Sequence, residues 1–393
     1  MIPEYYEFSN TVKVLSGRLA LENIPAELRA LGAMRPMLLT DAMLVKLGIA
    51  HKVVRAFAET EMEIGVVYSD IPADSSVEVV NAIAAEYLRS GCDSLVAVGG
   101  GSVIDTAKGL SIIISAGASD LMDYMGVDVL GPRKVPFIVV PTTAGTGSEA
   151  TSVAVIADTQ KNVKMEFVSG SLLPDVAVLD ARMTLSLPAR LTASTGMDTL
   201  SHAVEAYTCL QRNPVSSVFA ASAIELIRDN LLKAVTCGAD EDARLAMANA
   251  STLAGMAFSN SMVGIVHAIG HSLGGVAKVP HGDAMSILLP HCMEFNMKKV
   301  GALYGELLMH LAGAAVFAST KPSERPAKAV EAVRELAKSL AGVSGLPTRL
   351  SETRVTREQF GAVARAAVND GAMIVNPVHA DENDVIAILE RAF

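Results

Sequence analysis

Tryptophan is absent from the 393 residues, and aromatic residues make up only 4% of the chain. Proteins that bind single-stranded nucleic acids stack bases on aromatic rings and follow the phosphate backbone with basic residues. Here 42 acidic residues outnumber 32 basic ones, the net charge is −10, and no block of like charge stands out. The composition therefore argues against nucleic acid as a partner.

Cysteine is scarce as well. No two cysteines form a CxxC pair, so neither a thiolate zinc site nor a disulfide framework is expected. The first ten residues, MIPEYYEFSN, contain acids and no apolar run, which argues against a signal peptide. We therefore expect a protein of the reducing cytoplasm. The cysteines are Cys92, Cys209, Cys237 and Cys292.

One long stretch lacks charge: residues 245–277 contain no Asp, Glu, Lys or Arg. A membrane-spanning helix needs about 20 mostly apolar residues. This stretch is interrupted by glycines and carries polar residues such as Asn249 and Asn260. We therefore expect two buried helices inside a helical domain, and no membrane partner.

The length predicts two domains, since one domain typically has about 100–200 residues. Up to residue 186, β-branched apolar runs alternate with helical patterns, which predicts a mainly parallel sheet covered by helices. The expected fold is an α/β domain over 1–186 and an all-helical domain over 187–393. The predicted strands are 11–15, 37–40, 64–68, 94–98, 135–140, 152–156, 163–168 and 176–179, and the first predicted helices are 19–31, 42–59, 75–90 and 103–116.

The run SLVAVGGGSVIDTAKGL predicts a strand, a glycine loop and a helix. Gly99, Gly100 and Gly101 let the backbone approach a ligand closely, and the start of the next helix favours a phosphate. Ser102 is expected to cap that helix, with Asp105 as the acid of a capping box. The alternative is an ordinary tight turn, but three consecutive glycines favour phosphate binding.

A second loop, PTTAGTGSEA at 141–150, matches the letters of the dinucleotide fingerprint G-x-G-x-x-G/A. The fingerprint requires a helix next, whereas TSVAVIAD is strand-like, so we reject it. Thr142, Thr143 and Thr146 remain candidates to contact a phosphate or ribose. Asp41 ends the run MLLTD, where an acid can bind ribose hydroxyls and favour NAD over NADP, or simply cap the next helix.

Five of the eight histidines lie between residues 202 and 291. Asp198 and His202 are four residues apart, as are His267 and His271, which places each pair on one helix face. His281 follows in a predicted loop. A carboxylate with imidazoles suits Fe²⁺ or Zn²⁺, although local hydrogen bonds could also explain each histidine. The predicted metal ligands are Asp198, His202, His267 and His281.

The segment GHSLG at 270–274 matches the nucleophile elbow G-x-S-x-G of α/β-hydrolases. Ser272 would be the nucleophile, with Asp370 and His379 as partners. The elbow needs a full helix after it, yet Pro280 follows eight residues later, and no HGGG-type segment precedes it. A serine hydrolase is therefore only a remote alternative.

Five motifs, in this order, resemble those of the iron-containing (group III) alcohol dehydrogenases over nearly the whole chain. They are VGGGSVIDTAK, PTTAGTGSEAT, STGMDTLSHAVEAY, GIVHAIGHSLGGVAKVPHG and ILLPHCMEFN. The resemblance implies an α/β dinucleotide-binding domain over 1–186, an all-helical metal-binding domain over 187–393, and the same four metal ligands. It also implies that His271 lies near the nicotinamide, that Lys164 lies at the cofactor, and that Asp41 favours NAD. Two positions depart from the family pattern, where Ser217 replaces an acid and Val378 an arginine.

The activity that this resemblance implies is a metal-dependent, NAD-linked alcohol dehydrogenase using Fe²⁺, with Zn²⁺ as a possible substitute. It would interconvert small primary alcohols or diols and aldehydes, with His271 relaying a proton, in a homo-oligomer of two or more chains. Glycerol dehydrogenase and maleylacetate reductase are alternatives with the same fold. A dehydroquinate-synthase-like lyase would need several basic residues, and only Lys278 lies between 245 and 296.

Overall fold

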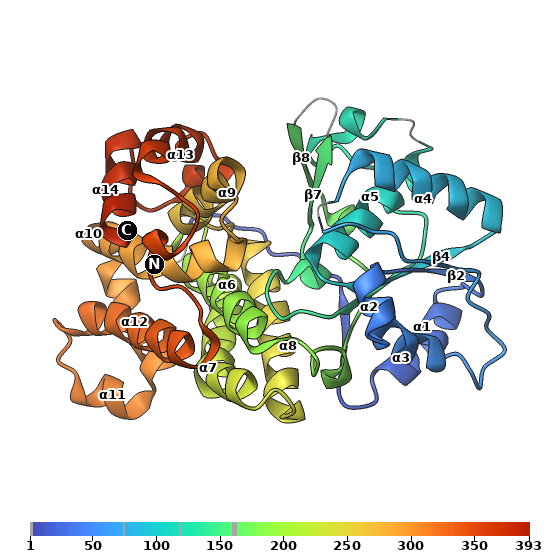
Figure 1. Ribbon diagram of the computed structural model, residues 1–393, viewed down its shortest axis with the longest axis horizontal. Coiled ribbons are helices and arrows are strands. Elements are labelled where there is room, and N and C mark those ends of the chain that lie inside the picture. The colour runs from blue at the N-terminus through green and yellow to red at the C-terminus, as the bar shows by residue number, and fades with distance from the viewer. Residues whose placement is uncertain (1–2, 74, 118–119, 159–162) are drawn as a thin grey trace. The chain divides into compact units, whose positions relative to one another are not determined.

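The computed structural model describes residues 3–73, 75–117, 120–158 and 163–393, leaving aside the side chains of 163 and 164. The chain divides into two compact units, which Figure 1 shows coloured along the chain. We call Ser9–Leu185 the α/β unit. Ser186–Phe393, together with the N-terminal residues as far as Phe8, form the helical unit.

The α/β unit is built on a six-stranded parallel sheet in the order β1-β9-β6-β4-β2-β3. The central strands β4 and β6 pair in register from Leu95 opposite Phe137 to Gly99 opposite Pro141. This arrangement confirms the predicted parallel sheet. The strands are β1 (Lys13–Ser16), β2 (Pro36–Leu39), β3 (Val66–Tyr68), β4 (Ser94–Gly99), β6 (Phe137–Pro141) and β9 (Val176–Leu179).

Both faces of this sheet are covered by helices. Leu95 of β4 belongs to a core with α4 (Val77–Ser90) and α5 (Gly101–Ala116). The next residue, Val96, belongs to a separate core on the other face, which η1 (Leu21–Asn23), α1 (Ile24–Ala30), α2 (Ala42–Lys46) and α3 (Ile49–Arg55) complete. Successive side chains of a strand point to opposite faces, so a strand buried on both faces is a continuous apolar run.

Two predicted helices of the α/β unit are subdivided. The helix expected over 42–59 breaks at Gly48, whose φ of +72° ends α2 in the left-handed region before α3 begins. Glycine adopts this conformation without the steric cost that a Cβ brings. The helix expected over 19–31 begins instead with the 3-10 turn η1 and continues as α1.

A smaller sheet in the order β5-β8-β7 accompanies the main one. Its strands are β5 (Gly126–Val127), β7 (Val153–Asp158) and β8 (Val163–Val168), of which β7 and β8 run antiparallel. Ala154 and Ile156 of β7 pack into the core beneath α4 and α5. The segment after the second loop is therefore a strand, which confirms the rejection of the dinucleotide fingerprint. Short 3-10 turns are η2 (Leu121–Tyr124), η3 (Ser148–Ala150), η4 (Gly170–Leu172) and η5 (Ala181–Met183).

The helical unit contains no strand among the residues described from 186 onward. α7 shows how its helices begin, because Asn213 accepts a hydrogen bond from the Ser216 backbone N–H at 2.9 Å and Pro214 takes the first helical position. The helices are α6 (Ala189–Thr208), α7 (Pro214–Thr236), α8 (Glu241–Phe258), α9 (Ile265–Ala277), α10 (His281–Ala312), α11 (Ala314–Ser319), α12 (Arg325–Ser344), α13 (Phe360–Ala367) and α14 (Glu382–Ala392), with 3-10 turns η6 (Leu350–Glu352), η7 (Arg357–Gln359) and η8 (Gly371–Val375).

The uncharged stretch at 245–277 forms most of α8 and all of α9, as expected from its interruptions. Met262 lies between the two helices in the left-handed region, with a φ of +66°. Across the described ranges, none of the helices combines the length and the apolar character that a membrane crossing requires.

From the sequence, the N-terminal residues are expected in the α/β domain, but in the structure they belong to the helical unit. Phe8 stacks on Phe219 of α7, with ring centroids 5.5 Å apart. An aromatic pair of this kind adds a specific contact to the burial of the two rings. The α/β unit therefore begins at Ser9 and ends at Leu185, and the segments before and after it belong to the helical unit.

We expect Gly196→Ala in α6 to lower the free energy of unfolding by about 1–3 kcal/mol, the usual cost of overpacking a core. The added Cβ would lie 2.2 Å from Leu231 Cδ1, and Leu231 is fully buried in α7. Urea unfolding of the purified variant measures this.

Gly342→Ala is the matched control, because a Cβ at this position in α12 would meet no atom within 4 Å. It should raise the free energy of unfolding by about 0.5–1 kcal/mol, since alanine favours a helix over glycine. Equal effects of the two variants would contradict the packing described for α6 and α7.

Candidate functional site

Helix α6 carries three acidic or imidazole side chains on one face: Asp198, His202 and Glu205. Their spacing of four and then three residues aligns them along the helix. All three are buried, with 3%, 6% and 5% of their surface exposed. Such groups are rarely buried without partners, so this face of α6 must be matched by other elements.

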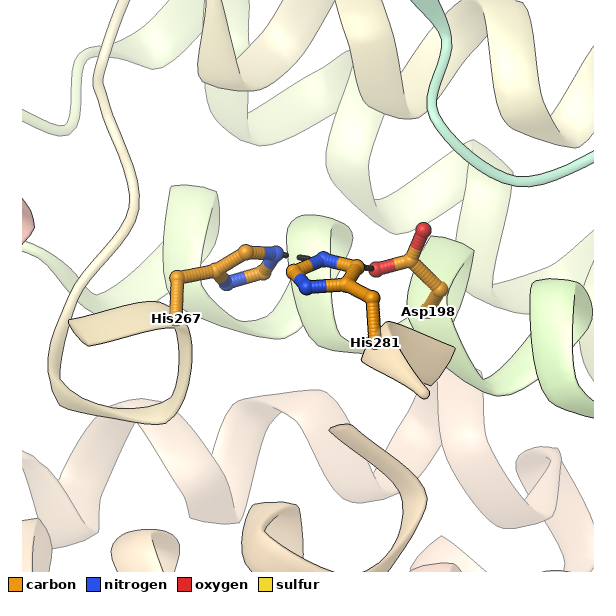
Figure 2. Close-up of side chains that lie close together, drawn as sticks. All are labelled: Asp198, His267 and His281. Atoms are coloured by element: carbon orange, nitrogen blue, oxygen red, sulfur yellow. Dashed lines mark ion pairs between the residues drawn. The ribbon is translucent and has the colours of Figure 1, made fainter. Parts of the chain in front are cut away.

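Helices α9 and α10 supply the matching groups. His267 lies in the first turn of α9 and His281 is the first residue of α10, not part of a loop as expected. Asp198 Oδ1 lies 3.7 Å from His267 Nε2 and 3.3 Å from His281 Nε2. Figure 2 shows the three side chains converging, and their ligand atoms all lie within 4.8 Å of one another. The structure thus brings together three of the four predicted ligands.

His202, the fourth predicted ligand, lies beside this group. Its Nδ1 is 3.9 Å from Asp198 Oδ1. Its ring is held between Phe258 and His267, with centroid separations of 4.3 and 4.4 Å. His202 therefore borders the cluster on the buried side, although it does not belong to the group whose ligand atoms all lie within 4.8 Å.

Three buried atoms of the cluster fit a bound cation. Asp198 Oδ1, His202 Nδ1 and His267 Nε2 make no hydrogen bond to any residue in the described ranges. Buried polar atoms without partners are costly and call for an explanation such as an ion. One carboxylate oxygen and imidazole nitrogens are a donor set that Fe²⁺ and Zn²⁺ both accept.

The pKa values of Asp198 and His267 also indicate that the cluster favours a bound positive charge. Burial opposes the charge of Asp198, yet the imidazoles of His202 and His281 hold its pKa well below the usual range. Burial also opposes the charge of His267, but the carboxylates of Asp198 and Glu205 raise its pKa to about 9. Burial lowers the pKa of His202 to about 3, against the attraction of Asp198. A metal ion would replace the proton on His267 and neutralise these carboxylates.

The position of His281 is set by the neighbouring residues of α10. Arg190 donates two hydrogen bonds to Asp283, of 2.8 and 2.6 Å, and the Ser194 hydroxyl donates a third at 3.1 Å. A Cβ on Gly282 would lie 2.5 Å from the Ser194 carbonyl oxygen. The start of α10 therefore lies directly against α6, which brings His281 to Asp198.

His271 lies one turn after His267 on α9. Its ring centroid is 5.4 Å from that of His281, and the two rings are stacked. His271 Nδ1 is 3.0 Å from Asp370 Oδ2. Burial opposes the charge of Asp370, but the hydrogen bond from His271 holds the pKa of Asp370 below its usual value. The side chains of His271 and His281 are 44% and 40% exposed, so this side of the cluster is open.

Sequence reasoning missed the supporting acids Glu205 and Asp283, and it considered Asp370 only as a partner of Ser272. Glu205 could have been identified from the sequence, because it lies three residues after His202 on the same helix face. No sequence pattern indicates the roles of Asp283 and Asp370, because their partners, Arg190 and His271, are distant in sequence. The two departures from the family pattern lie outside the cluster: Ser217 is in α7, and the Val378 carbonyl accepts a hydrogen bond from Asn376 at 2.7 Å.

The serine hydrolase alternative is wrong. Ser272 lies within α9, and its hydroxyl donates to the Ala268 carbonyl at 3.0 Å. A nucleophile elbow needs a sharp turn from a strand into a helix. Here the serine is inside the helix, and the acid proposed as its partner, Asp370, binds His271 instead.

The glycine loop joins β4 to α5, but its helix cap differs from the prediction. The N-cap residue is Gly100, whereas Ser102 donates to the Ala73 carbonyl. Asp105 does not complete a capping box. It accepts from the Ser148 hydroxyl at 2.8 Å and from the Val155 backbone N–H at 3.1 Å. The first N–H groups of α5 are thus left without a side-chain cap of their own.

The threonine loop lies against the glycine loop. A Cβ on Gly100 would be 3.4 Å from Thr143 Oγ1, and one on Gly101 would be 3.1 Å from Thr146 Cγ2. The Thr142 backbone N–H donates to the Gly99 carbonyl at 3.0 Å. The two loops therefore pack closely, and a side chain at Gly101 would be crowded by Thr146.

Asp41 lies at the same edge of the sheet. It follows β2, the glycine loop follows β4 and the threonine loop follows β6, and these three parallel strands are neighbours. The carboxyl ends of such strands form the usual nucleotide-binding edge of an α/β sheet. Asp41 Oδ1 accepts the Leu44 backbone N–H at 2.9 Å, so the helix-capping role is confirmed while contact with a ribose remains a prediction. Lys164 pairs with Ala157 across β8 and β7, and its side chain lies outside the described residues.

A fully buried lysine joins α5 to the loop that follows the threonines. Lys108 Nζ donates to Ser148 Oγ at 3.1 Å, to the Thr151 carbonyl at 2.8 Å and to the Val153 carbonyl at 2.7 Å. Asp105 contacts the same Ser148 hydroxyl. These contacts fix the relative positions of the two predicted cofactor loops.

Family models match both parts of the chain. "Iron-containing alcohol dehydrogenase" matches residues 11–181, and "Fe-containing alcohol dehydrogenase family, C-terminal" matches residues 192–393. The chain belongs to the iron-containing alcohol dehydrogenase family. It is an oxidoreductase of a family that uses iron and NAD, which confirms the resemblance noted in the motifs.

Individual proteins agree with this assignment along the whole chain. The NAD-dependent methanol dehydrogenase of Bacillus methanolicus is 35% identical over 383 residues, covering 96% of this chain and 97% of the relative. The 1,3-propanediol dehydrogenase of Klebsiella pneumoniae is 36% identical over 386 residues, covering 96% of each. A crystal structure of 1,3-propanediol oxidoreductase superimposes with a TM-score of 0.94 at 34% identity, covering 99% of this chain and 100% of the other.

We expect Lys108 to make the stability of the α/β unit depend on pH. Burial lowers the pKa of Lys108 from 10.5 to about 8, against the attraction of Asp105 and Glu149. Between these values the unfolded chain binds more protons than the folded one, so the free energy of unfolding rises with pH. The free energy of unfolding of the wild type, minus that of Lys108→Met, should rise by up to about 3 kcal/mol between pH 8 and pH 10.5.

Urea unfolding of both proteins at several pH values measures this difference, in which the contributions of titrating groups remote from Lys108 cancel. A difference that stays constant with pH would contradict the burial of a charged lysine at this position.

Proposed function

We propose that this alcohol dehydrogenase oxidises small primary alcohols or diols, and reduces the matching aldehydes, at the cluster on α6, α9 and α10. The observation that carries this is the convergence of Asp198, His267 and His281 on one point beside unpartnered buried atoms. We assign the metal ligands as these three residues and His202, whose buried Nδ1 faces the same carboxylate.

The substrate assignment is supported by the relatives and by the local charge. The two relatives above are named for methanol and 1,3-propanediol, which are small uncharged alcohols. Residues 245–277 contribute no charged Asp, Glu, Lys or Arg side chain near the cluster. A carboxylated or phosphorylated substrate would need cationic side chains here, so maleylacetate reduction is disfavoured, and no observation favours glycerol.

A bound Fe²⁺ or Zn²⁺ ion supplies a Lewis acid that makes an alcohol easier to deprotonate, and NAD supplies the hydride acceptor. The residues of the chain provide the setting for this chemistry. Asp198 contributes the negative charge that retains a cation, and the stack of Phe258, His202 and His267 closes the cluster on the buried side. The exposed side at His271 and His281 is where a small alcohol would enter.

His271 is our candidate for carrying the proton that the alcohol releases. Its Nδ1 is held by the carboxylate of Asp370 at 3.0 Å, so Nε2 is the nitrogen left to accept a proton. Imidazoles commonly act as general bases in this way. Its exposed side chain can return the proton to water.

We assign the cofactor to the edge of the main sheet. The phosphates would bind backbone N–H groups of Gly99, Gly100, Gly101 and Ser102 at the start of α5, since this helix end has no side-chain cap. The ribose and phosphate contacts would come from Thr142, Thr143, Thr146 and Lys164. Asp41, placed at the carboxyl end of β2, would favour NAD by repelling a 2′-phosphate.

The cytoplasmic location and the assembly into a dimer or larger homo-oligomer are also proposals. Cys92, Cys209, Cys237 and Cys292 are all free thiols, which supports a reducing compartment. Size-exclusion chromatography with light scattering would determine the number of chains.

The activity is tested by measuring NADH formation on chelator-treated protein with a panel of short primary alcohols and diols. Anaerobic addition of Fe²⁺ should restore turnover, with NAD preferred over NADP. No turnover with either cofactor, in the presence of either Fe²⁺ or Zn²⁺, would overturn the proposal.

The ligand assignment is tested by His267→Ala. Losing a ligand should weaken metal binding by more than the roughly 10–100-fold typical of losing a ligand's hydrogen-bond partner, and should abolish turnover. The control is His310→Ala, which removes a surface histidine whose Nδ1 lies 2.9 Å from Glu225. Metal content by mass spectrometry would be unchanged in the control, and an unchanged value in His267→Ala would overturn the assignment.

A further inference from the structure

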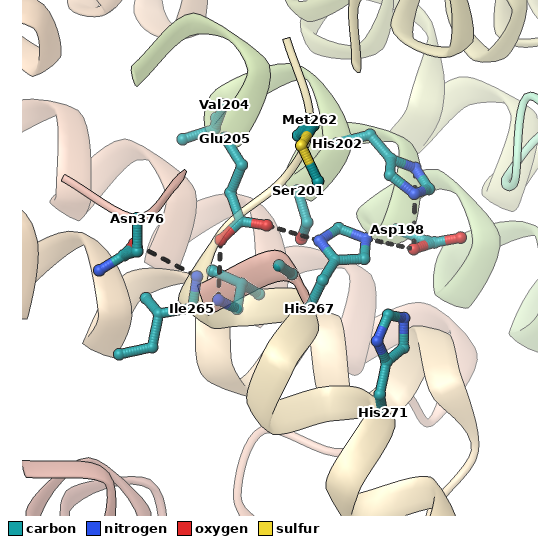
Figure 3. A network of polar contacts seen from close by, with 12 residues as sticks. Asp198, Ser201, His202, Val204, Glu205, Met262, Ile265, His267, His271 and Asn376 are labelled. Carbon is teal, nitrogen blue, oxygen red and sulfur yellow. Dashed lines mark hydrogen bonds and ion pairs between the residues drawn. The ribbon is translucent and has the colours of Figure 1, made fainter. Parts of the chain in front are cut away.

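Glu205 is a buried carboxylate that the proposed chemistry leaves unused. Figure 3 shows it between α6 and the first turn of α9. Its Oε2 lies 2.5 Å from His267 Nδ1, and its Oε1 accepts the Val266 backbone N–H at 2.7 Å. One carboxylate thus holds both the ring of His267 and the backbone next to it.

The start of α9 depends on this contact. Its N-cap residue is Gly264, which has no side chain to satisfy the first N–H groups of the helix. Glu205 accepts the N–H of Val266, and Asn376 Oδ1 accepts the N–H of Ile265 at 3.2 Å. A Cβ on Gly264 would lie 3.1 Å from Glu205 Oε1 and 2.9 Å from Asn376 Oδ1. Glycine therefore allows two side chains from elsewhere to replace the missing cap.

The same contact decides which nitrogen of His267 faces the cluster. An ionised carboxylate can only accept hydrogen bonds, so the imidazole must carry its proton on Nδ1. Once the proton on Nε2 is released, this atom has a lone pair for a metal ion, and it is this atom that lies 3.7 Å from Asp198 Oδ1 and lacks a hydrogen-bond partner among the described residues. Carboxylates that hold a ligand histidine in this way fix its tautomer and orientation in many metal sites.

We propose that Glu205 is a positioning residue for the metal ion: its carboxylate holds His267 in the Nδ1–H tautomer and turns Nε2 toward Asp198 and His281. Glu205 lies one helical turn beyond His202, so α6 carries two ligands and the support for a third. This inference rests on the proposed metal-binding role of His267.

The test is Glu205→Gln, which keeps the size of the side chain. The amide oxygen can still accept the Val266 N–H, but the amide NH₂ group then faces His267 Nδ1 and requires it to accept. The proton would move to Nε2, the atom that must bind the metal. Zn²⁺ affinity, measured by competition with a chromophoric chelator, should fall about 10–100-fold.

Glu225→Gln is the matched control, because His310 Nδ1 lies 2.9 Å from Glu225 in a similar pair outside the cluster. Its Zn²⁺ affinity should equal that of the wild type. If wild type and Glu205→Gln bind Zn²⁺ equally well, this inference is overturned while the metal site stands. If the wild type binds no Zn²⁺, the proposed metal site is overturned and the inference with it.

A second measurement does not require the variant to fold. Nitrogen-15 NMR of histidine side chains in the Zn²⁺-loaded wild type reports which ring nitrogen carries the proton. We expect His267 to be protonated at Nδ1, with Nε2 bound to the metal. A proton on Nε2, or metal bound through Nδ1, would overturn the role of Glu205.

Discussion

A carboxylate buried among imidazoles is the interaction on which the helical unit depends. Asp198 is 3% exposed, and the helices packed around it include a 33-residue stretch, 245–277, without any lysine or arginine. A buried charge without compensation is far too costly for a stable fold. The groups that lower the pKa of Asp198 are the imidazoles of His202, His281 and His267. A protonated histidine or a bound metal ion would therefore balance its charge, and the binding of that ion would be coupled to the stability of the surrounding helices.

The rest of the unit is arranged to bring those groups to Asp198. Gly264 lets Glu205 and Asn376 approach the start of α9, which supplies His267, and Gly282 lets α10 start directly against α6, which supplies His281. Each glycine is required because two chain segments approach closely, and neither lies in the left-handed region of backbone conformation. The geometry of the cluster thus follows from helix ends, where short segments can be positioned by a few hydrogen bonds.

Much of this could be predicted from the sequence because the signals were local. Doubly buried parallel strands appeared as apolar runs, and the spacing of Asp198 and His202 identified one face of α6. The failures have physical reasons. Ser102 was expected to cap α5, but Gly100 is the N-cap residue. The Ser102 hydroxyl instead donates to the Ala73 carbonyl, 29 residues away in sequence. The partnership of His271 with Asp370 spans 99 residues, and no local pattern reports a contact at that distance.

The direct test is X-ray diffraction from a crystal loaded with Fe²⁺ or Co²⁺, recorded at the absorption edge of the metal. A single anomalous peak within bonding distance of Asp198, His202, His267 and His281, with Glu205 still against His267 Nδ1, is the predicted result. A strongest peak elsewhere in the chain, or one at this place that His267 does not contact, would contradict the assignment of this cluster as the metal centre.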